Sequence, residues 1–241
     1  MKKIKSYIPN TITCLNLFFG CMACVAAFKY NYILASYFIY TAAICDFFDG
    51  FAARLLNEKS PIGKDLDSLA DCVSFGVAPG FILYSWLQNV TMPGFASNYQ
   101  PYIAIVAFVI PVFSALRLAK FNIDTRQTTS FIGLPTPACT IFFASLAAKQ
   151  PCFFVHHGYM LIFLILFFAF LMVAEFPMFA LKFKHYGWKG NELRYAFIAL
   201  SAILLLLYKI SVFHIIILLY IIISAIAAIL QKKKETENTA D

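Results

Sequence analysis

The stretch DFFDGFAARLLNEKSPIGKDLDSLAD, residues 46–71, decides the fold of this chain, because it sets four of its aspartates in strongly apolar surroundings. Asp46 and Asp49 lie three residues apart, and Asp67 and Asp71 lie four apart, so each pair shares one face of a helix. A Ser-Pro pair and a glycine between the two pairs should break the helix. We therefore expect two helices that meet with their carboxylates facing each other across a turn.

The composition is that of an integral membrane protein. Hydrophobic residues make up 61% of the 241 positions and charged residues 13%, whereas soluble domains are roughly 45 to 50% apolar and about 25% charged. One aspartate at the centre of a membrane helix costs about 2.5 to 3.5 kcal/mol, so four unrelieved ones would approach ~10 kcal/mol. Cations or water must relieve that cost. No separate soluble domain is evident, and we expect one membrane domain over residues 1–241.

Apolar segments predict the membrane spans, each of which needs about 20 mainly apolar residues. We expect an all-α, polytopic membrane protein with about eight transmembrane helices. The fifth is the weakest of them, because it is short and opens with two prolines. The eight segments are Thr11–Phe28, Ile33–Ala53, Leu66–Leu87, Tyr102–Leu118, Pro137–Ala148, Tyr159–Met178, Tyr195–Tyr208 and Val212–Leu230.

The positive charges predict the orientation. With eight spans, both termini and the even-numbered connections lie on one side of the membrane, and that side holds all but three of the nineteen Lys and Arg residues. The opposite side keeps Lys29, Lys149 and Lys209. Because Lys and Arg accumulate on the cytoplasmic side, we expect a protein of the cytoplasmic membrane with both termini in the cytoplasm. Residues 232–241 form a polar tail there, and the aspartates lie at the cytoplasmic face.

The aspartates predict a divalent-metal site. Facing carboxylates repel one another unless a cation lies between them, and an all-oxygen set favours Mg²⁺ or Mn²⁺ over zinc. Gly50 and Ala53 lie on the same face as Asp46 and Asp49, and their small side chains let a bulky substrate approach the backbone. Arg54, one turn along, can donate to a phosphate oxygen. Two metals, a diphosphate and an arginine are recurring parts of phosphoryl-group transfer.

Two other classes of function compete with an enzyme. In a divalent-cation transporter, intramembrane aspartates would coordinate the ion being carried. The acidic residues gather at one face of the membrane, however, and the later spans offer no acidic partners to continue a path. A non-catalytic scaffold would need the four carboxylates to bind metal for structural reasons alone.

The run D-x-x-D-G-x-x-A-R-x8-G-x3-D-x3-D from Asp46 to Asp71 resembles the complete signature of the CDP-alcohol phosphatidyltransferase family, with every fixed position filled. The resemblance implies that divalent metals, two ions by this analogy, help an alcohol to displace CMP from a CDP-linked donor. It implies that Asp46, Asp49 and Asp67 bind the metals. Asp71 would contact the second metal and act as general base. Candidates for contacts with the CDP part of the donor are Gly50, Arg54, Ser60 in the turn and Asn10 before the first helix.

The segments on either side of the aspartate run indicate which alcohol is the acceptor. Residues 8–20, 66–80, 114–124 and 131–138 are similar to segments of bacterial and archaeal phosphatidylserine synthases within that family, which places a catalytic core at about residues 8–138. This implies CDP-diacylglycerol and L-serine as substrates, membrane lipids as surroundings and a homodimer, with no nucleic acid as partner. Glycerol 3-phosphate and inositol phosphate stay open as acceptors. For the serine carboxylate the candidates are Arg117, Lys120 and Asn122, expected on the connection after the fourth span.

Overall fold

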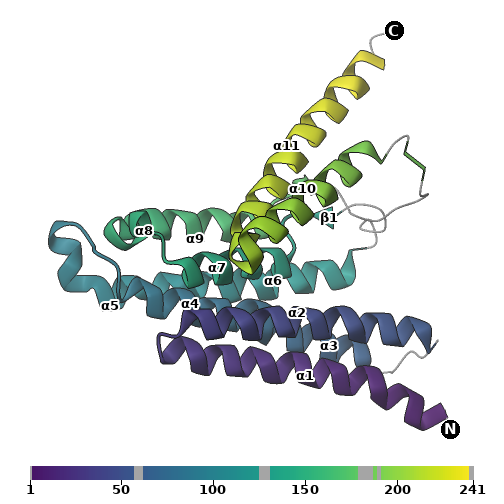
Figure 1. The fold of residues 1–241 in the computed structure, drawn as a ribbon, viewed down its shortest axis with the longest axis horizontal. Helices are drawn as coiled ribbons and strands as arrows, with labels where there is room; N and C mark the ends of the chain where they lie inside the picture. The colour runs from purple at the N-terminus through teal and green to yellow at the C-terminus, as the bar shows by residue number, and fades with distance from the viewer. Residues whose placement is uncertain (1, 57–61, 125–130, 179–186, 189–190, 239–241) are drawn as a thin grey trace.

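The structure, a computed structural model, describes residues 2–56, 62–124, 131–178, 187–188 and 191–238. Its main elements are helices that run in alternating directions and form one bundle (Figure 1). The α-helices are α1 (Lys2–Phe28), α2 (Tyr32–Leu55), α3 (Gly63–Cys72), α4 (Ala78–Leu87), α5 (Gln100–Ile103), α6 (Val109–Ile123), α7 (Thr136–Lys149), α8 (Cys152–His156), α9 (Gly158–Val173), α10 (Glu192–Tyr208) and α11 (Phe213–Asn238). A π-helix, η1 (Val73–Val77), joins α3 to α4, and 3₁₀ turns occupy η2 (Gly94–Tyr99), η3 (Ala104–Phe108) and η4 (Lys209–Val212).

The first two helices form a tight hairpin. Asn31 begins α2, and its side-chain oxygen accepts a hydrogen bond of 3.0 Å from the backbone N–H of Leu34, as expected of an N-cap. Ala23, Ala27 and Ala35 are fully buried between the helices and their neighbours. Small side chains let membrane helices approach closely, and the hairpin thereby holds α2 in register beside α1.

The π-helix η1 fixes the position of α3 in the bundle. A Cβ added at Gly20 of α1 would lie 2.8 Å from the Cα of Ser74, so α1 runs directly against η1. The Ser74 hydroxyl donates to the backbone oxygen of Asn16 on α1 (2.9 Å). On the other side, the Thr140 hydroxyl of α7 donates to the backbone oxygen of Phe75 (2.6 Å). Such π turns are common next to functional sites, and η1 begins two residues after Asp71.

The middle of the bundle is formed by α7 and its neighbours. Phe142 and Phe143 of α7 are buried, and the Phe142 ring stacks on Phe168 of α9 with centroids 4.2 Å apart. A helix that is apolar all round belongs inside a protein core or a membrane. The outer surface also exposes apolar side chains, among them Phe47 and Leu55 of α2 at 62% and 73%. This distribution fits a bundle surrounded by lipid rather than by water.

A short pair of strands ties two connections together. Strand β1 (Phe131–Ile132) pairs in antiparallel fashion with β2 (Pro177–Met178), so that the segment before α7 meets the segment after α9. Gly133 follows β1 with φ +73, and its N–H donates to the backbone oxygen of Phe176 (2.9 Å). A Cβ at Gly133 would lie 3.1 Å from the backbone oxygen of Ala174. Both the close approach and the positive φ therefore favour glycine here.

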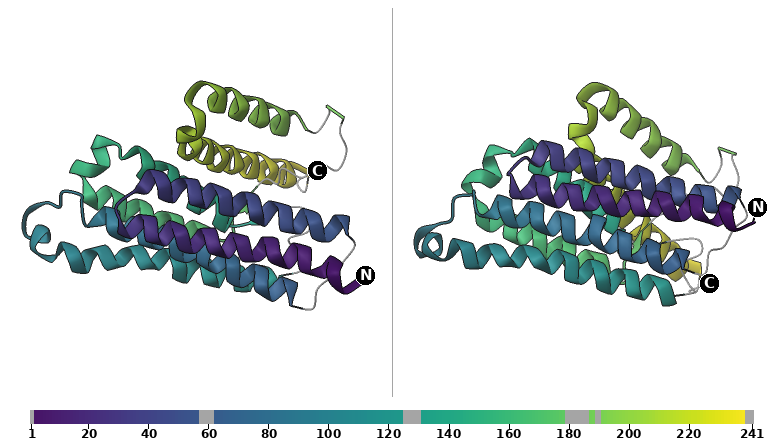
Figure 2. Two further views of the ribbon diagram at one scale, coloured as in Figure 1. Left: turned by 60° about the horizontal axis from the view of Figure 1, so that its bottom comes forward. Right: turned by 90° about the horizontal axis from the view of Figure 1, so that it is seen from below.

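The expected all-α membrane fold is confirmed, whereas the number of spans is not. Within the described residues, five stretches are long and apolar enough to cross a bilayer: Tyr7–Phe28, Tyr32–Leu55, Gly63–Leu87, Gly94–Ile123 and Glu192–Ile229. The 14 residues of α7 and the 16 of α9 extend only about 21 and 24 Å at 1.5 Å per residue, below the roughly 30 Å hydrocarbon core. Glu192–Ile229 contains two helices, α10 and α11, and the chain reverses between them at η4 (Figure 2).

The helix ends that carry the aspartates lie at one end of the bundle. Helix α2 ends there, α3 begins there, and α1 begins and α11 ends on the same side (Figures 1 and 2). Helix α11 continues through Asn238, so the residues of the predicted polar tail up to that point are helical. One end of the bundle thus combines the acidic stretch with the most basic part of the chain.

Candidate active site

Three carboxylates converge between α2 and α3. Ligand oxygens of Asp46, Asp49 and Asp67 all lie within 4.8 Å of one another. Asp49 is buried, and the other two are half-buried. One oxygen of Asp67 is buried and has no hydrogen-bond partner in the part of the chain that the structure describes. Because an unpaired buried carboxylate oxygen is costly, this atom indicates a position for a cation.

Asp71 lies one helical turn beyond Asp67, on the same face of α3. Its carboxylate interacts electrostatically with Asp46, Asp67 and Asp49, and one of its oxygens accepts a hydrogen bond of 3.2 Å from the Asn16 side-chain amide. Asp71 is not one of the three residues whose oxygens meet within 4.8 Å, but its carboxyl group lies within hydrogen-bonding reach of that of Asp46. Asp71 therefore adjoins the edge of the cluster.

Helix α1 supplies polar partners that the sequence analysis did not select. The Thr13 hydroxyl donates to Asp49 (2.6 Å), and the Asn16 amide donates to Asp71 (3.2 Å). Both side chains are buried. Asn10, Thr13 and Asn16 recur every three residues in an apolar helix, and this spacing is the signal that could have identified them. The first helix therefore contributes hydrogen-bond donors to the carboxylates.

The small residues of the signature lie on an open part of α2. A Cβ added at Gly50 would meet no heavy atom of the described residues within 4 Å, and Gly50 is exposed. The protein's own packing thus gives no reason for a glycine at this position. Arg54 is also exposed, and its Nε donates to the backbone oxygen of Gly50 (2.9 Å). The surface beside the carboxylates is therefore accessible to a ligand.

Asn10 and Ser60 were predicted to contact the nucleotide. The expectation that Asn10 precedes the first helix was wrong, because α1 begins at Lys2 and includes Asn10. Pro9, next to it, is accommodated inside the helix. Asn10 is half-buried and engaged in a polar interaction. Ser60, the other candidate, lies outside the described residues.

The three candidates for the serine carboxylate lie on α6, and the expected connection after Leu118 was wrong. Helix α6 continues to Ile123, because the polar side chains of its last turns find partners in the bundle. Asn122 donates to the Ser68 hydroxyl (2.8 Å), and its backbone oxygen accepts from Lys64 (3.1 Å). Both partners belong to α3, so Asn122 ties the end of α6 to the helix that carries Asp67.

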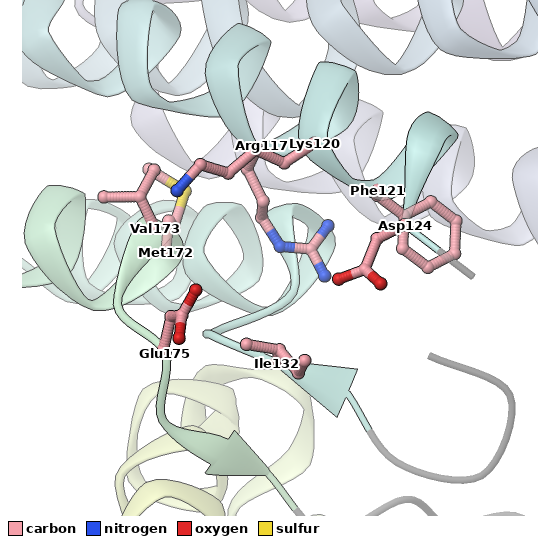
Figure 3. A pocket seen from close by; sticks show the side chains of 8 residues that line it. All are labelled: Arg117, Lys120, Phe121, Asp124, Ile132, Met172, Val173 and Glu175. Carbon is pink, nitrogen blue, oxygen red and sulfur yellow. The ribbon is translucent and has the colours of Figure 1, made fainter. Parts of the chain in front are cut away.

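Arg117 and Lys120 line a pocket at the end of α6, whereas Asn122 is not among the described lining residues (Figure 3). The cavity volume of this pocket is about 40 Å³. Arg117 is 7% exposed, and its Nε has no hydrogen-bond partner among the described residues. Its charge interacts with Asp71, so the pocket lies next to the carboxylates. The full lining is Arg117, Lys120, Phe121, Asp124, Ile132, Met172, Val173 and Glu175.

The donor set fits a hard divalent cation. Carboxylate oxygens with neither His nor Cys suit Mg²⁺ or Mn²⁺. Mg²⁺ sites commonly use one or two protein carboxylates and leave the remaining positions to water or substrate phosphates. The converging oxygens of the three aspartates and the unpartnered oxygen of Asp67 meet these requirements.

Comparison with known proteins agrees with this chemistry. The chain is 41% identical over 133 residues to the CDP-diacylglycerol–serine O-phosphatidyltransferase of Bacillus subtilis, which is 55% of this chain and 70% of that protein. Proteins of the same name from Helicobacter pylori (strain J99) and Methanocaldococcus jannaschii are 38% identical over 136 residues and 37% identical over 134. These two matches cover 55% and 54% of this chain, and 54% and 55% of the relatives, about half of their length. Residues 6–176 match the CDP-alcohol phosphatidyltransferase family over more than half of the chain, and the chain belongs to that family.

Proposed function

We propose that this chain is a phosphatidylserine synthase, which transfers the phosphatidyl group of CDP-diacylglycerol to the hydroxyl of L-serine and releases CMP. The observation that carries the proposal is the convergence of the Asp46, Asp49 and Asp67 carboxylates beside Asp71, at one end of an apolar bundle. Membership of the family and the names of the relatives support the choice of substrates. Such a site suits a donor whose acyl chains stay in lipid while the soluble acceptor enters from water.

Each side chain has a proposed part in the reaction. Asp46, Asp49 and Asp67 hold Mg²⁺ or Mn²⁺, which when bound neutralises charge on the diphosphate and on the departing CMP. Asp71, at the edge of the cluster, takes the proton of the serine hydroxyl. The serine oxygen then forms a bond to the donor's lipid-linked phosphorus as the bond from that phosphorus to the CMP oxygen breaks.

The donor binds along the exposed part of α2. The open surface at Gly50 lets the nucleotide diphosphate lie close to the helix backbone. Arg54 can leave its intrahelical hydrogen bond with Gly50 and donate to a phosphate oxygen. Asn10 and Ser60 remain candidates for contacts with the nucleotide.

We further propose that the protein crosses the cytoplasmic membrane eight times, with both termini and the aspartates on the cytoplasmic side. The alternating helix directions in Figure 1 support this count, with α7 and α9 as short spans and α10 and α11 as two. A homodimer is part of the same proposal and rests on the family resemblance. Cysteine labelling from either side of the membrane, at positions in the α1–α2 turn and in α11, would test the orientation.

The experiment that tests the function is CMP release by the purified protein in lipid nanodiscs. CDP-diacylglycerol is supplied with Mn²⁺ or Mg²⁺, and serine, glycerol 3-phosphate and inositol phosphate are offered separately. We expect release with serine, and loss of that release in Asp71→Asn. Asp65→Asn is the matched control, because Asp65 lies on the same helix but is exposed and outside the cluster. Release with another acceptor alone would overturn the substrate, and release with none would overturn the enzyme.

A further inference from the structure

The beginning of α3 has little apolar packing to hold it in place. Among the ten residues of this helix, Ala70 is the only buried one, and it lies in the second half. Asp67, which contributes to the carboxylate cluster, precedes it. Helices in proteins are held mostly by the packing of an apolar face, which the first turns of α3 do not have. Polar contacts therefore have to determine how this end of the helix lies.

Three residues join α3 to the end of α6 through a closed ring of hydrogen bonds. The Asn122 side-chain amide of α6 donates to the Ser68 hydroxyl (2.8 Å), and this hydroxyl donates to the backbone oxygen of Lys64 (3.1 Å). The Lys64 amine in turn donates to the backbone oxygen of Asn122 (3.1 Å). A hydroxyl has one hydrogen to donate, so Ser68, which gives it to Lys64, has to accept from Asn122. The amide nitrogen of Asn122 therefore faces α3.

The ring holds the beginning of α3 against α6. Within the described residues, the hydrogen bonds that join residues 63–68 to another helix both involve Asn122. The Lys64 amine also supplies a partner for a carbonyl in the last turn of α6, where helix carbonyls lack partners of their own. Ser68 and Asn122 are half-buried, so water competes only partly for their bond. The ring thus sets both the position and the rotation of this end of α3.

The rotation of α3 decides where Asp67 points. Ser68 follows Asp67 directly, and successive side chains lie about 100° apart around a helix. One face of α3 therefore meets Asn122 while the next one brings an Asp67 oxygen within 4.8 Å of those of Asp46 and Asp49. A rotation that separates Ser68 from Asn122 would move Asp67 as well. Functional side chains have to be held within roughly 0.5 Å of their working positions, so a small rotation is enough to disturb the cluster.

We propose that Asn122 is a positioning residue of the metal site, which acts through Ser68 to hold Asp67 toward the carboxylates of α2. This role rests on the proposed function, in which those carboxylates bind Mg²⁺ or Mn²⁺. It differs from the contact with the serine carboxylate for which the sequence made Asn122 a candidate. The Asn122 amide is directed to α3, and Asn122 is not among the described lining residues of the pocket beside Arg117.

The test measures Mn²⁺ binding itself, through the electron paramagnetic resonance signal of the free ion, with purified protein in detergent. We expect Ser68→Ala and Asn122→Ala each to raise the Kd for Mn²⁺ about three- to tenfold, the scale of one lost hydrogen bond. The double variant should bind no more weakly than the single ones, because all three lack the same bond. Ser68→Thr keeps the hydroxyl and should bind Mn²⁺ within about twofold of the unmodified protein.

Two further measurements separate this role from a general loss of stability and from contact with the acceptor. Ser85→Ala is the matched control, because the Ser85 hydroxyl bonds to the backbone oxygen of Ile82 in its own helix; its Kd for Mn²⁺ should not change. At saturating Mn²⁺, we expect the KM for serine to change less than about twofold in Ser68→Ala and Asn122→Ala. A higher KM for serine in Asn122→Ala alone, with unchanged Mn²⁺ binding, would overturn the positioning role in favour of an acceptor contact.

The remaining outcomes are distinct as well. Unchanged Mn²⁺ affinity in both variants, in protein that still releases CMP with serine, would overturn the positioning role and leave the proposed function standing. If Asn122→Ala does not fold, the comparison of Ser68→Ala with Ser68→Thr decides, because equal Mn²⁺ affinities in these two would also overturn it. Equal Mn²⁺ affinities in the unmodified protein and in Asp67→Asn would overturn the metal site itself, and the role of Asn122 with it.

Discussion

The Thr13 hydroxyl of α1 donates a 2.6 Å hydrogen bond to a carboxylate oxygen of Asp49 on α2, and both groups are buried. An oxygen of the same carboxylate meets those of Asp46 and Asp67 within 4.8 Å. Partners that orient a metal ligand restrict it to one position before the ion arrives. In our proposal, Thr13 therefore fixes how Asp49 presents its oxygen to the metal, although it does not itself bind the ion.

Replacing this hydroxyl should weaken metal binding. We expect Thr13→Val to raise the Mn²⁺ concentration for half-maximal activity about 10- to 100-fold, the range typical for partners of metal ligands, with little change in kcat at saturating Mn²⁺. Thr11→Val is the control, because the Thr11 hydroxyl bonds to the backbone oxygen of Tyr7 in its own helix. A titration of CMP release with Mn²⁺ tests this prediction. Equal midpoints for the two variants would contradict the role of Thr13 in orienting Asp49.

The clustered carboxylates should make the protein less stable without metal. Two like charges about 4 Å apart repel by roughly 4 kcal/mol at an effective dielectric of 20, and three carboxylates converge within 4.8 Å. We expect Asp67→Asn to abolish activity and yet to melt no lower than the unmodified protein in EDTA. Adding Mn²⁺ at 100 times its Kd should stabilise the unmodified protein by about 2.7 kcal/mol and should leave the variant unchanged.

Thermal unfolding in detergent, followed with and without Mn²⁺, measures this directly. Asp65→Asn serves again as the control and should respond to Mn²⁺ like the unmodified protein. The same Mn²⁺-dependent shift in Asp67→Asn would show that the ion binds elsewhere.

Two glycines allow packing to be separated from function. Gly50 has open space where a Cβ would be, whereas a Cβ at Gly20 would press against Ser74. We expect Gly50→Ala to gain about 1 kcal/mol of helix stability while raising the KM for CDP-diacylglycerol. Gly20→Ala should instead lower the melting temperature, because the backbones of α1 and η1 would have to move apart. Measuring the KM for CDP-diacylglycerol and the melting temperature of both variants separates an effect on donor binding from an effect on packing. A lower melting temperature of Gly50→Ala would mean that Gly50 serves packing.

The sequence predicted the aspartate pairs well because their physical cost is high. Carboxylates are costly in an apolar chain, so their presence indicates a function. The spacing of Asp46 with Asp49 and of Asp67 with Asp71 assigns each pair to one helix face. The structure brings these faces together, with α2 ending at Leu55 and α3 beginning at Gly63. The Ser-Pro pair that was predicted to break the helix lies outside the described residues. Long apolar helices such as α1 and α2 were equally clear, because length and hydropathy together determine them.

Other features depend on contacts between distant segments, which a pattern in one segment does not reveal. Arg117 and Lys120 look like the charged end of a span, yet α6 continues to Ile123 because Asn122 finds Ser68 on another helix. The π-helix η1 is held by Thr140, 65 positions from the carbonyl that it bonds. Glu175 lines the pocket beside Arg117, and the pairing of β1 with β2, two residues on each strand, joins its segment to the one before α7. None of these partners can be identified from local periodicity.

A double-mutant cycle between Asn16 and Asp71 tests whether Asp71 is positioned from α1. The Asn16 amide donates to the Asp71 carboxylate (3.2 Å), and this bond restrains the carboxylate that, in our proposal, takes the serine proton. We expect Asn16→Ala to lower kcat at least about tenfold, because misplacing a catalytic group by even 1 Å can cost about a hundredfold. In an Asp71→Ala background the same change should have little effect on the residual single-turnover rate, since residues that act through one another are not additive.

Asn89→Ala is the matched control, because Asn89 bonds to the Ser85 backbone away from the site. Equal effects of Asn16→Ala in both backgrounds would mean that Asn16 acts independently of Asp71, for example through the packing of its buried side chain.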